Sequence, residues 1–146
     1  MFDPVKVNLS EDLIVYKFLE REFSGGVKRY LSPYYGRSGP WRQGVRAVPF
    51  PTAGSLIDSD SRGRRMITAG MFHSYKYVTD ALNQSGVVAG TSVCRFRIPK
   101  DATVYAGVTF GGKPTYASTA IIFETELSYE EIEKLQQYEQ ASVLKK

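Results

Sequence analysis

The pattern of apolar and polar positions predicts strands along most of the chain. Residues 13–19 read Leu-Ile-Val-Tyr-Lys-Phe-Leu, an apolar, β-branched and aromatic run that is typical of a buried strand. A Ser-Gly-Gly turn at 24–26 allows residues 27–31 to pair back as the second arm of a hairpin. Residues 120–123, Ala-Ile-Ile-Phe, form the most apolar run, and we expect their strand to lie at the centre of the sheet.

Residues 92–98 alternate between two faces of a predicted strand. Cys94, Phe96 and Ile98 fall on one face, and the arginines at 95 and 97 fall on the other. Cys94 therefore shares its face with apolar side chains, which predicts a core thiol with a raised pKa rather than a reactive thiolate. Shorter strands are predicted near 45–48, 66–72 and 103–106.

A helix is predicted at the C-terminal end, over residues 128–144. Ser128 and Glu131 have the spacing of a capping box, in which each side chain bonds the backbone N–H of the other residue. Leu127 and Ile132 stand where a hydrophobic staple requires them. The glutamates of its first turn also suit the positive end of the helix dipole.

These elements predict an α+β fold in one domain spanning residues 1–146, with a mostly antiparallel sheet of five to seven strands and two helices. The composition, 42% apolar and 23% charged, is that of a globular chain. The chain has a single cysteine, which excludes an intramolecular disulfide. It also has a single histidine, so a Cys/His zinc cluster is excluded and no metal is predicted. No secretory signal and no long apolar run is visible, which predicts a cytoplasmic protein without a membrane partner.

The charges are distributed unevenly. Residues 27–65 carry eight lysines and arginines against two aspartates, whereas residues 124–139 carry six glutamates against one lysine. One interpretation is an anionic partner for the basic segment: a nucleotide-like small molecule, nucleic acid or an acidic host protein. The other is a solvated loop face, or a patch that pairs with the acidic helix.

Most of the basic segment is predicted to be irregular, because residues 32–65 are rich in Gly, Pro, Ser and Arg. Tyr34, Tyr35 and Trp41 are interleaved with its arginines. Aromatic rings among arginines suit base stacking combined with phosphate contacts, although the same rings could fold over the core. No RNA-binding signature or helix-turn-helix pattern is present, which argues against sequence-specific DNA reading.

No catalytic constellation is evident, and no catalytic residue is predicted. Glu124 and Glu126 flank Thr125 at a strand end, so we expect both on one face, as a carboxylate pair or simply as a strand running into an acidic helix start. A pair of Cys94 with His73 is disfavoured by the apolar surroundings of the cysteine. No serine-hydrolase or phosphate-loop motif is present.

His73 follows Gly70-Met71-Phe72 at a predicted strand-to-helix junction. The helix is expected to open at His73-Ser74-Tyr75 and to end near residue 83, with Ser74 as its N-cap. A ligand at such a junction could reach both the imidazole and free backbone amides. The alternative is a histidine that caps the helix or borders the core.

Several blocks of the chain resemble a group of small uncharacterised proteins of bacteriophages and gut bacteria. The blocks are Asp12 to Leu19, Tyr30 to Gly36, Gly70 to Tyr75, Ile98 to Gly107 and Tyr116 to Ile122. Their order matches along almost the whole chain. The resemblance implies a phage or mobile-element origin and carries no established activity.

The order strand, strand, helix, strand with Ile-Pro-Lys, and final apolar strand is similar to the ADP-ribosyltransferase fold. The resemblance implies that Tyr16-Lys17 stands at a Tyr-Arg motif and that His73-Ser74-Tyr75 stands at the second NAD-binding block. Tyr116 to Ala120 then stands where that family has its glutamate. The chain departs from the family in having Lys17 for the arginine, which is not equivalent at a bidentate phosphate site. It also has no carboxylate between Lys113 and Glu124.

The sequence therefore predicts an accessory protein of phage or mobile-element type, which binds an anionic, nucleotide-like ligand or a host macromolecule without catalysis or cofactor. The alternatives are an ADP-ribosyltransferase-like enzyme that uses NAD, a non-specific nucleic-acid binder and a virion-associated structural protein. The ligand, the host target and the oligomeric state stay open. The candidate ligand-binding residues are Tyr16, Lys17, Arg29, Tyr34, Tyr35, Arg42, Arg64, Arg65, His73, Ser74 and Tyr75.

Overall fold

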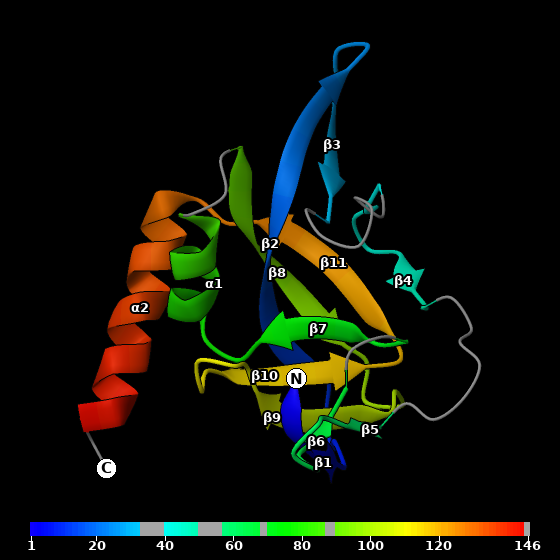
Figure 1. Cartoon of the computed structure of the whole chain (residues 1–146). Helices are drawn as coiled ribbons and strands as arrows, with labels where there is room; N and C mark the ends of the chain where they lie inside the picture. Colours follow the sequence, from blue (N-terminus) through cyan, green and yellow to red (C-terminus); the bar gives the residue numbers. More distant parts are fainter. Residues whose placement is uncertain (33–39, 50–56, 68–69, 87–89, 145–146) are drawn as a thin grey trace.

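Eleven strands and two helices make up the part of the chain that the computed structural model describes, residues 1–32, 40–49, 57–67, 70–86 and 90–144 (Figure 1). In chain order they are β1 (Phe2–Val7), β2 (Leu13–Ser24), β3 (Val27–Leu31), β4 (Arg46–Ala47), β5 (Asp58–Ser59), β6 (Arg65–Met66), β7 (Phe72–Tyr75), α1 (Val78–Ser85), β8 (Thr91–Ile98), β9 (Val104–Val108), β10 (Pro114–Ser118), β11 (Ile121–Glu126) and α2 (Tyr129–Leu144).

The strands join one antiparallel sheet in the order β4-β11-β8-β2-β7-β10-β9-β1-β6-β5, and β3 pairs with β2 beside this path. The α+β class, the single domain and the predicted hairpin at 24–26 are confirmed. The predicted strand number is too low. β4, β5 and β6 have two residues each, and a strand this short forms because a partner is present rather than through a pattern of its own.

The apolar strand β11 lies next to the end of the sheet rather than at its centre, so that expectation was wrong. The longest ladder joins β2 to β8, from Leu13 opposite Ile98 to Glu20 opposite Thr91. All three apolar side chains at 121–123 are nevertheless buried. A continuous apolar run indicates that both faces of a strand are buried. Side chains packed above and below the sheet can bury both faces of β11 even though it lies next to the end of the strand order.

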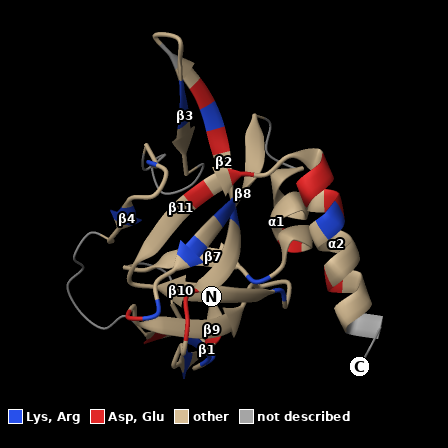
Figure 2. Ribbon diagram, turned by 180° about the vertical axis from the view of Figure 1, so that it is seen from behind, with Lys and Arg blue, Asp and Glu red and all other residues tan. Residues whose placement is uncertain are grey.

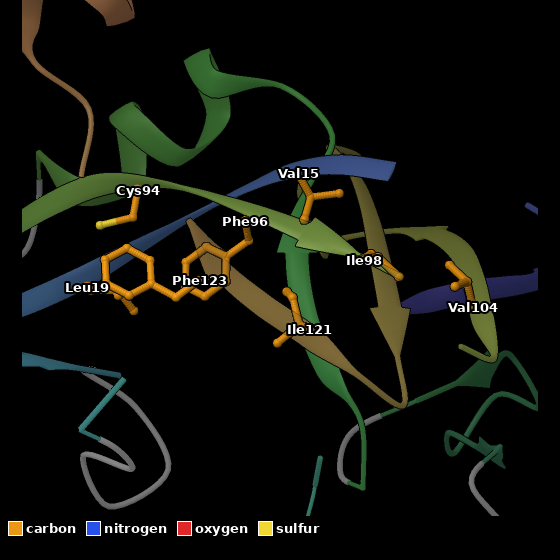
Figure 3. Close-up of a cluster of buried hydrophobic side chains, with 8 residues drawn as sticks. All are labelled: Val15, Leu19, Cys94, Phe96, Ile98, Val104, Ile121 and Phe123. Atoms are coloured by element: carbon orange, nitrogen blue, oxygen red, sulfur yellow. The ribbon is translucent and has the colours of Figure 1, made fainter. Parts of the chain in front are cut away.

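The two sheet faces are buried against different partners. One face, which we call the aromatic face, carries a cluster that includes Val15, Phe96 and Phe123 (Figure 3). The other, the helix face, packs Tyr16 and Val93 against α1 and α2 (Figure 1). Each fully buried aliphatic or aromatic side chain contributes about 1.5–3 kcal/mol, so both layers stabilise the sheet.

The two helices begin differently from one another. In α2, the N–H of Glu131 donates to Ser128 Oγ at 3.2 Å and the N–H of Ser128 donates to Glu131 Oε1 at 3.1 Å, which confirms the capping box. Ser74, in contrast, lies inside β7 and caps nothing. Helix α1 begins only at Val78, and its Tyr77 N-cap makes no side-chain cap bond. The cap comes instead from Glu139 of α2.

Candidate functional site

A groove of about 450 Å³ opens on the aromatic face, between the β2–β3 hairpin, β11 and the segment at 40–45. It is lined by Lys28, Tyr30, Trp41, Gln43, Phe123, Thr125 and Glu126. Its volume lies in the range of small-molecule pockets, and its lining combines aromatic rings with a few convergent polar groups. The groove is therefore the main candidate site in the described part of the chain.

The aromatic rings of the groove are held in place by defined contacts. Trp41 meets Phe96 edge-on with ring centroids 5.1 Å apart, and Tyr30 meets Phe123 in the same way at 5.1 Å. Trp41 Nε1 donates to Ser32 Oγ at 2.9 Å, and its backbone N–H donates to the Tyr30 carbonyl at 2.8 Å. Such contacts pre-orient the rings, so a stacking ligand need not order them.

Glu126 is the polar centre of the groove. Its Oε1 accepts hydrogen bonds from Lys28 Nζ at 2.7 Å and Tyr30 OH at 3.1 Å, and Arg21 lies 3.8 Å from Oε2. Burial opposes ionisation, but the hydrogen bonds from Lys28, Ser92 and Tyr30 outweigh it and lower the pKa of Glu126. The carboxylate is thus ionised at neutral pH and fixes Lys28 at the groove wall.

Glu124 and Glu126 do not lie on one face, as their spacing predicted, and they do not form a carboxylate pair. The register of β11 against β8 shifts between Phe123 and Thr125, which is a β-bulge. Glu124 consequently bonds Arg95 and Arg97 of β8 at 2.8 and 2.9 Å, while Glu126 turns to the groove. Figure 2 shows the acidic positions of β11 beside the basic positions of β8.

A row of polar side chains crosses the aromatic face beside the groove. Tyr16 is opposite Tyr75 and Ser74 is opposite Tyr116, which places Lys17, Ser74 and Tyr116 side by side on β2, β7 and β10. Lys17 Nζ donates to the carbonyl of His73, and burial lowers the pKa of Lys17 to about 8. Ser74 Oγ is buried without a hydrogen-bond partner among the described residues.

His73 and Tyr16 point away from this row. His73 lies opposite Ala117, its Nε2 is buried and unpartnered within the described chain, and burial lowers its pKa to about 4. It is therefore neutral at pH 7. Tyr16 is 8% exposed and packs under the helices, so it is a core residue and does not line the groove. Tyr75 lies on the helix face as well.

The predicted arginines do not converge. Arg64 forms a bidentate ion pair with Asp3, with contacts of 2.7 and 3.2 Å, and its guanidinium lies 4.5 Å from the centroid of the Phe2 ring. It and Arg65 stand near the β5 end of the sheet, far along the strand order from the groove. Arg42 is exposed and adjoins Trp41, and Arg29 lies on β3. Tyr34 and Tyr35 lie outside the described residues.

Cys94 lies in the core, on the face of β8 that also carries Phe96 and Ile98. Cys94 is buried, and burial raises its pKa to about 12, which confirms a core thiol. Among the described residues no three His, Cys, Asp or Glu side chains gather where they could hold a metal ion. No helix in that part of the chain is long and apolar enough to cross a membrane.

Sequence reasoning missed Lys28, Gln43, Thr125 and Glu126 as groove residues. They come from three separate segments, and the bond between Lys28 and Glu126 joins positions 98 residues apart. Trp41 was noticed, but nothing in its segment indicated that it would face Tyr30 and β11. In comparisons with known proteins, no family model, curated protein or solved structure matched this chain.

Proposed function

We propose that this protein binds a nucleotide-like ligand, an aromatic ring joined to an anionic group, in the groove on the aromatic face, and that it does so without chemical turnover. One observation carries the proposal: Tyr30, Trp41 and Phe123 meet Lys28, Gln43 and Thr125 in one groove of about 450 Å³. Rings supply stacking surface, and the polar groups supply the few directional contacts that fix a ligand's orientation.

The ring of the ligand is expected to stack on the exposed parts of the groove aromatics, Trp41 above all. Stacking of a base on an aromatic side chain contributes about 1–3 kcal/mol and tolerates any base, because every base has a π face. Gln43 offers both a donor and an acceptor, and Thr125 a hydroxyl, to the polar edge of the ring. Together these contacts favour a heteroaromatic ring over a purely apolar one.

The anionic group is expected at the rim, on Arg42. Lys28 is ion-paired with Glu126, so its ammonium is less available to a phosphate. Arg42 follows Trp41 directly, is exposed, and makes no ion pair with a described residue. Its guanidinium can hold a phosphate through two parallel hydrogen bonds. Lys17, in the neighbouring polar row, is a second cation on the same face, with one hydrogen bond to a carbonyl.

The test uses Trp41, the single tryptophan of the chain, as a reporter inside the groove. We expect AMP, ADP-ribose or NAD to change its fluorescence, and adenosine and ribose 5-phosphate to bind more weakly because each lacks half of the ligand. Arg42→Gln should weaken binding about tenfold, the effect of losing one charge-assisted contact. Arg65→Gln, an exposed arginine at the other end of the sheet, is the matched control.

The proposal fails if none of these compounds alters the fluorescence or the thermal stability, or if Arg65→Gln weakens binding as much as Arg42→Gln. A ligand at a hundredfold excess over its Kd should add about 2.7 kcal/mol of stability, which a thermal melt detects. Short single-stranded DNA is titrated at two salt concentrations in parallel. Binding that falls steeply with salt would favour non-specific nucleic-acid binding instead.

NAD turnover is the second candidate function, and one observation favours it. Tyr16-Lys17, His73-Ser74-Tyr75 and Tyr116 to Ala120, the blocks that resemble ADP-ribosyltransferases, stand on or directly after the neighbouring strands β2, β7 and β10. Against it, residues 114–123 contain no carboxylate to stabilise a positively charged transition state. Incubation with NAD decides the matter. Release of nicotinamide would overturn the non-enzymatic proposal, and its absence beside NAD binding would support it.

A further inference from the structure

We propose a second binding site on the helix face, which takes a cationic nitrogen group, a guanidinium in particular. A pocket of about 330 Å³ lies there between α1 and the β9–β10 turn. Its lining includes Asp80, Asn83 and Gln84 of α1, Tyr75 of β7, and Phe110 and Lys113 of the turn region. None of the groove residues lines this pocket, so the two sites are separate.

Asp80 is the residue on which the proposal rests. Its side chain is 9% exposed, lines the pocket and makes no hydrogen bond with any described residue. Burial raises its pKa, and the Glu139 carboxylate adds to this, while Lys113 acts in the opposite direction. A buried carboxylate without hydrogen bonds is unfavourable unless a donor reaches it.

Lys113 compensates Asp80 only weakly. Its Nζ lies 4.0 Å from Asp80 Oδ1, beyond hydrogen-bond distance, and its side chain is 58% exposed. Because the Lys113 ammonium is exposed and makes no hydrogen bond to Asp80, its rotation into solvent would cost little interaction energy. A ligand cation that reaches hydrogen-bond distance of Asp80 can therefore displace it.

The remaining lining suits a guanidinium better than a compact ammonium. Asn83 and Gln84 follow Asp80 by three and four residues, so they share its side of α1, and their carbonyl oxygens can accept further N–H groups. A guanidinium presents five N–H donors in a plane, which matches one carboxylate and two amides. Phe110, 91% exposed at the mouth, offers a ring face for stacking with the cation.

The guanidinium could belong to a small metabolite or to an arginine side chain of a partner protein, and the probes distinguish these sources. Agmatine represents the free compound, and a blocked tripeptide with a central arginine represents the side chain. Butylamine and a blocked lysine tripeptide test the preference for a guanidinium. Binding is measured from chemical-shift changes of the backbone amides of α1 and of residues 109–113.

We expect millimolar or tighter binding of at least one guanidinium probe. Asp80→Asn, which keeps the shape and removes the charge, should weaken it at least tenfold. Lys113→Gln, which removes the competing cation, should tighten it severalfold. Asp58→Asn, an exposed aspartate on β5, is the matched control and should change nothing. Opposite effects of two substitutions in one pocket cannot both result from poor folding.

The proposal is overturned if no guanidinium probe shifts these amides, or if Lys113→Gln weakens binding as Asp80→Asn does. Equal binding of amine and guanidinium probes would overturn the assignment to a guanidinium. Failure of the nucleotide proposal leaves this site untouched, because Arg42→Gln alters the groove alone. Agmatine binding should therefore be the same in Arg42→Gln and in the unchanged protein.

Discussion

Glu139 of α2 caps the N-terminus of α1 by accepting the backbone N–H of Val78 at 2.6 Å. Its second oxygen accepts the Thr79 hydroxyl at 2.7 Å. The cap of a helix N-terminus normally comes from the residue just before the first turn. Here it comes from a side chain 61 residues further along the sequence. The two helices are thus joined by a charged hydrogen bond, and the Glu139 carboxylate is near enough to Asp80 to help raise the pKa of that residue.

Glu139→Ala should destabilise the protein by about 1–2 kcal/mol, because two donors of the first turn of α1 lose their acceptor. Urea unfolding measures this change. Glu133→Ala, an exposed glutamate of the same helix, is the control and should stay within about 0.5 kcal/mol of the unchanged protein. Equal destabilisation by both substitutions would show that helix propensity, not the cap, sets the effect.

Gly107→Ala should disturb the contact between β1 and β9. A Cβ added at Gly107 would lie 2.5 Å from the Phe2 carbonyl oxygen and 2.5 Å from Met1 Cγ. The first neighbour is backbone, so the strand must shift, at a cost of about 1–3 kcal/mol. Gly111→Ala, whose added Cβ would lie 3.9 Å from Thr109 Oγ1, should be far milder in the same unfolding measurement.

Stability should fall as the pH drops from 6.5 towards 4, and His73 should account for part of this loss. Its pKa is about 4 in the folded protein and near 6.5 when unfolded, so the unfolded chain binds more protons in this window. The contribution of His73 is on the order of 2–3 kcal/mol. His73→Gln should remove it. Identical pH profiles for the two proteins over this window would contradict the buried neutral imidazole.

Lys17 should add a second rise of stability with pH, in the alkaline range. Its pKa is about 8 in the folded protein and about 10.5 when unfolded, so the unfolded chain again binds more protons between these values and stability rises with pH there. Lys17→Met replaces the buried ammonium by an apolar side chain of similar length and should flatten this rise. The difference between the two profiles isolates Lys17 from other groups that titrate above pH 9.

Cys94 should not react with a thiol-specific disulfide reagent while the protein is folded. Its side chain is buried and its pKa is raised to about 12, so the thiolate is scarce and inaccessible. Modification should follow the rate of unfolding and become fast in urea. Rapid labelling in native buffer would place the thiol at the surface.

Local signals in the sequence predicted the elements that depend on neighbours along the chain. The Ser-Gly-Gly turn gave the β2–β3 hairpin, and alternation over residues 92–98 placed Cys94, Phe96 and Ile98 in the core. The capping box at Ser128 set the start of α2. In each case the signal and the structure lie within a few residues of each other, so propensity and periodicity suffice.

Tertiary structure decided the features that depend on register and on distant partners. The bulge in β11 separated Glu124 from Glu126, and Glu139 took the capping role expected of Ser74. The arginines of the basic segment lie far apart in the fold. Arg64 pairs with Asp3 near the β5 end of the sheet, whereas Arg42 adjoins Trp41 at the groove. By itself the sequence determined the α+β class, the hairpin and the buried thiol. The groove and the Asp80 pocket exist only because strand order and helix packing bring segments together that have no local reason to meet.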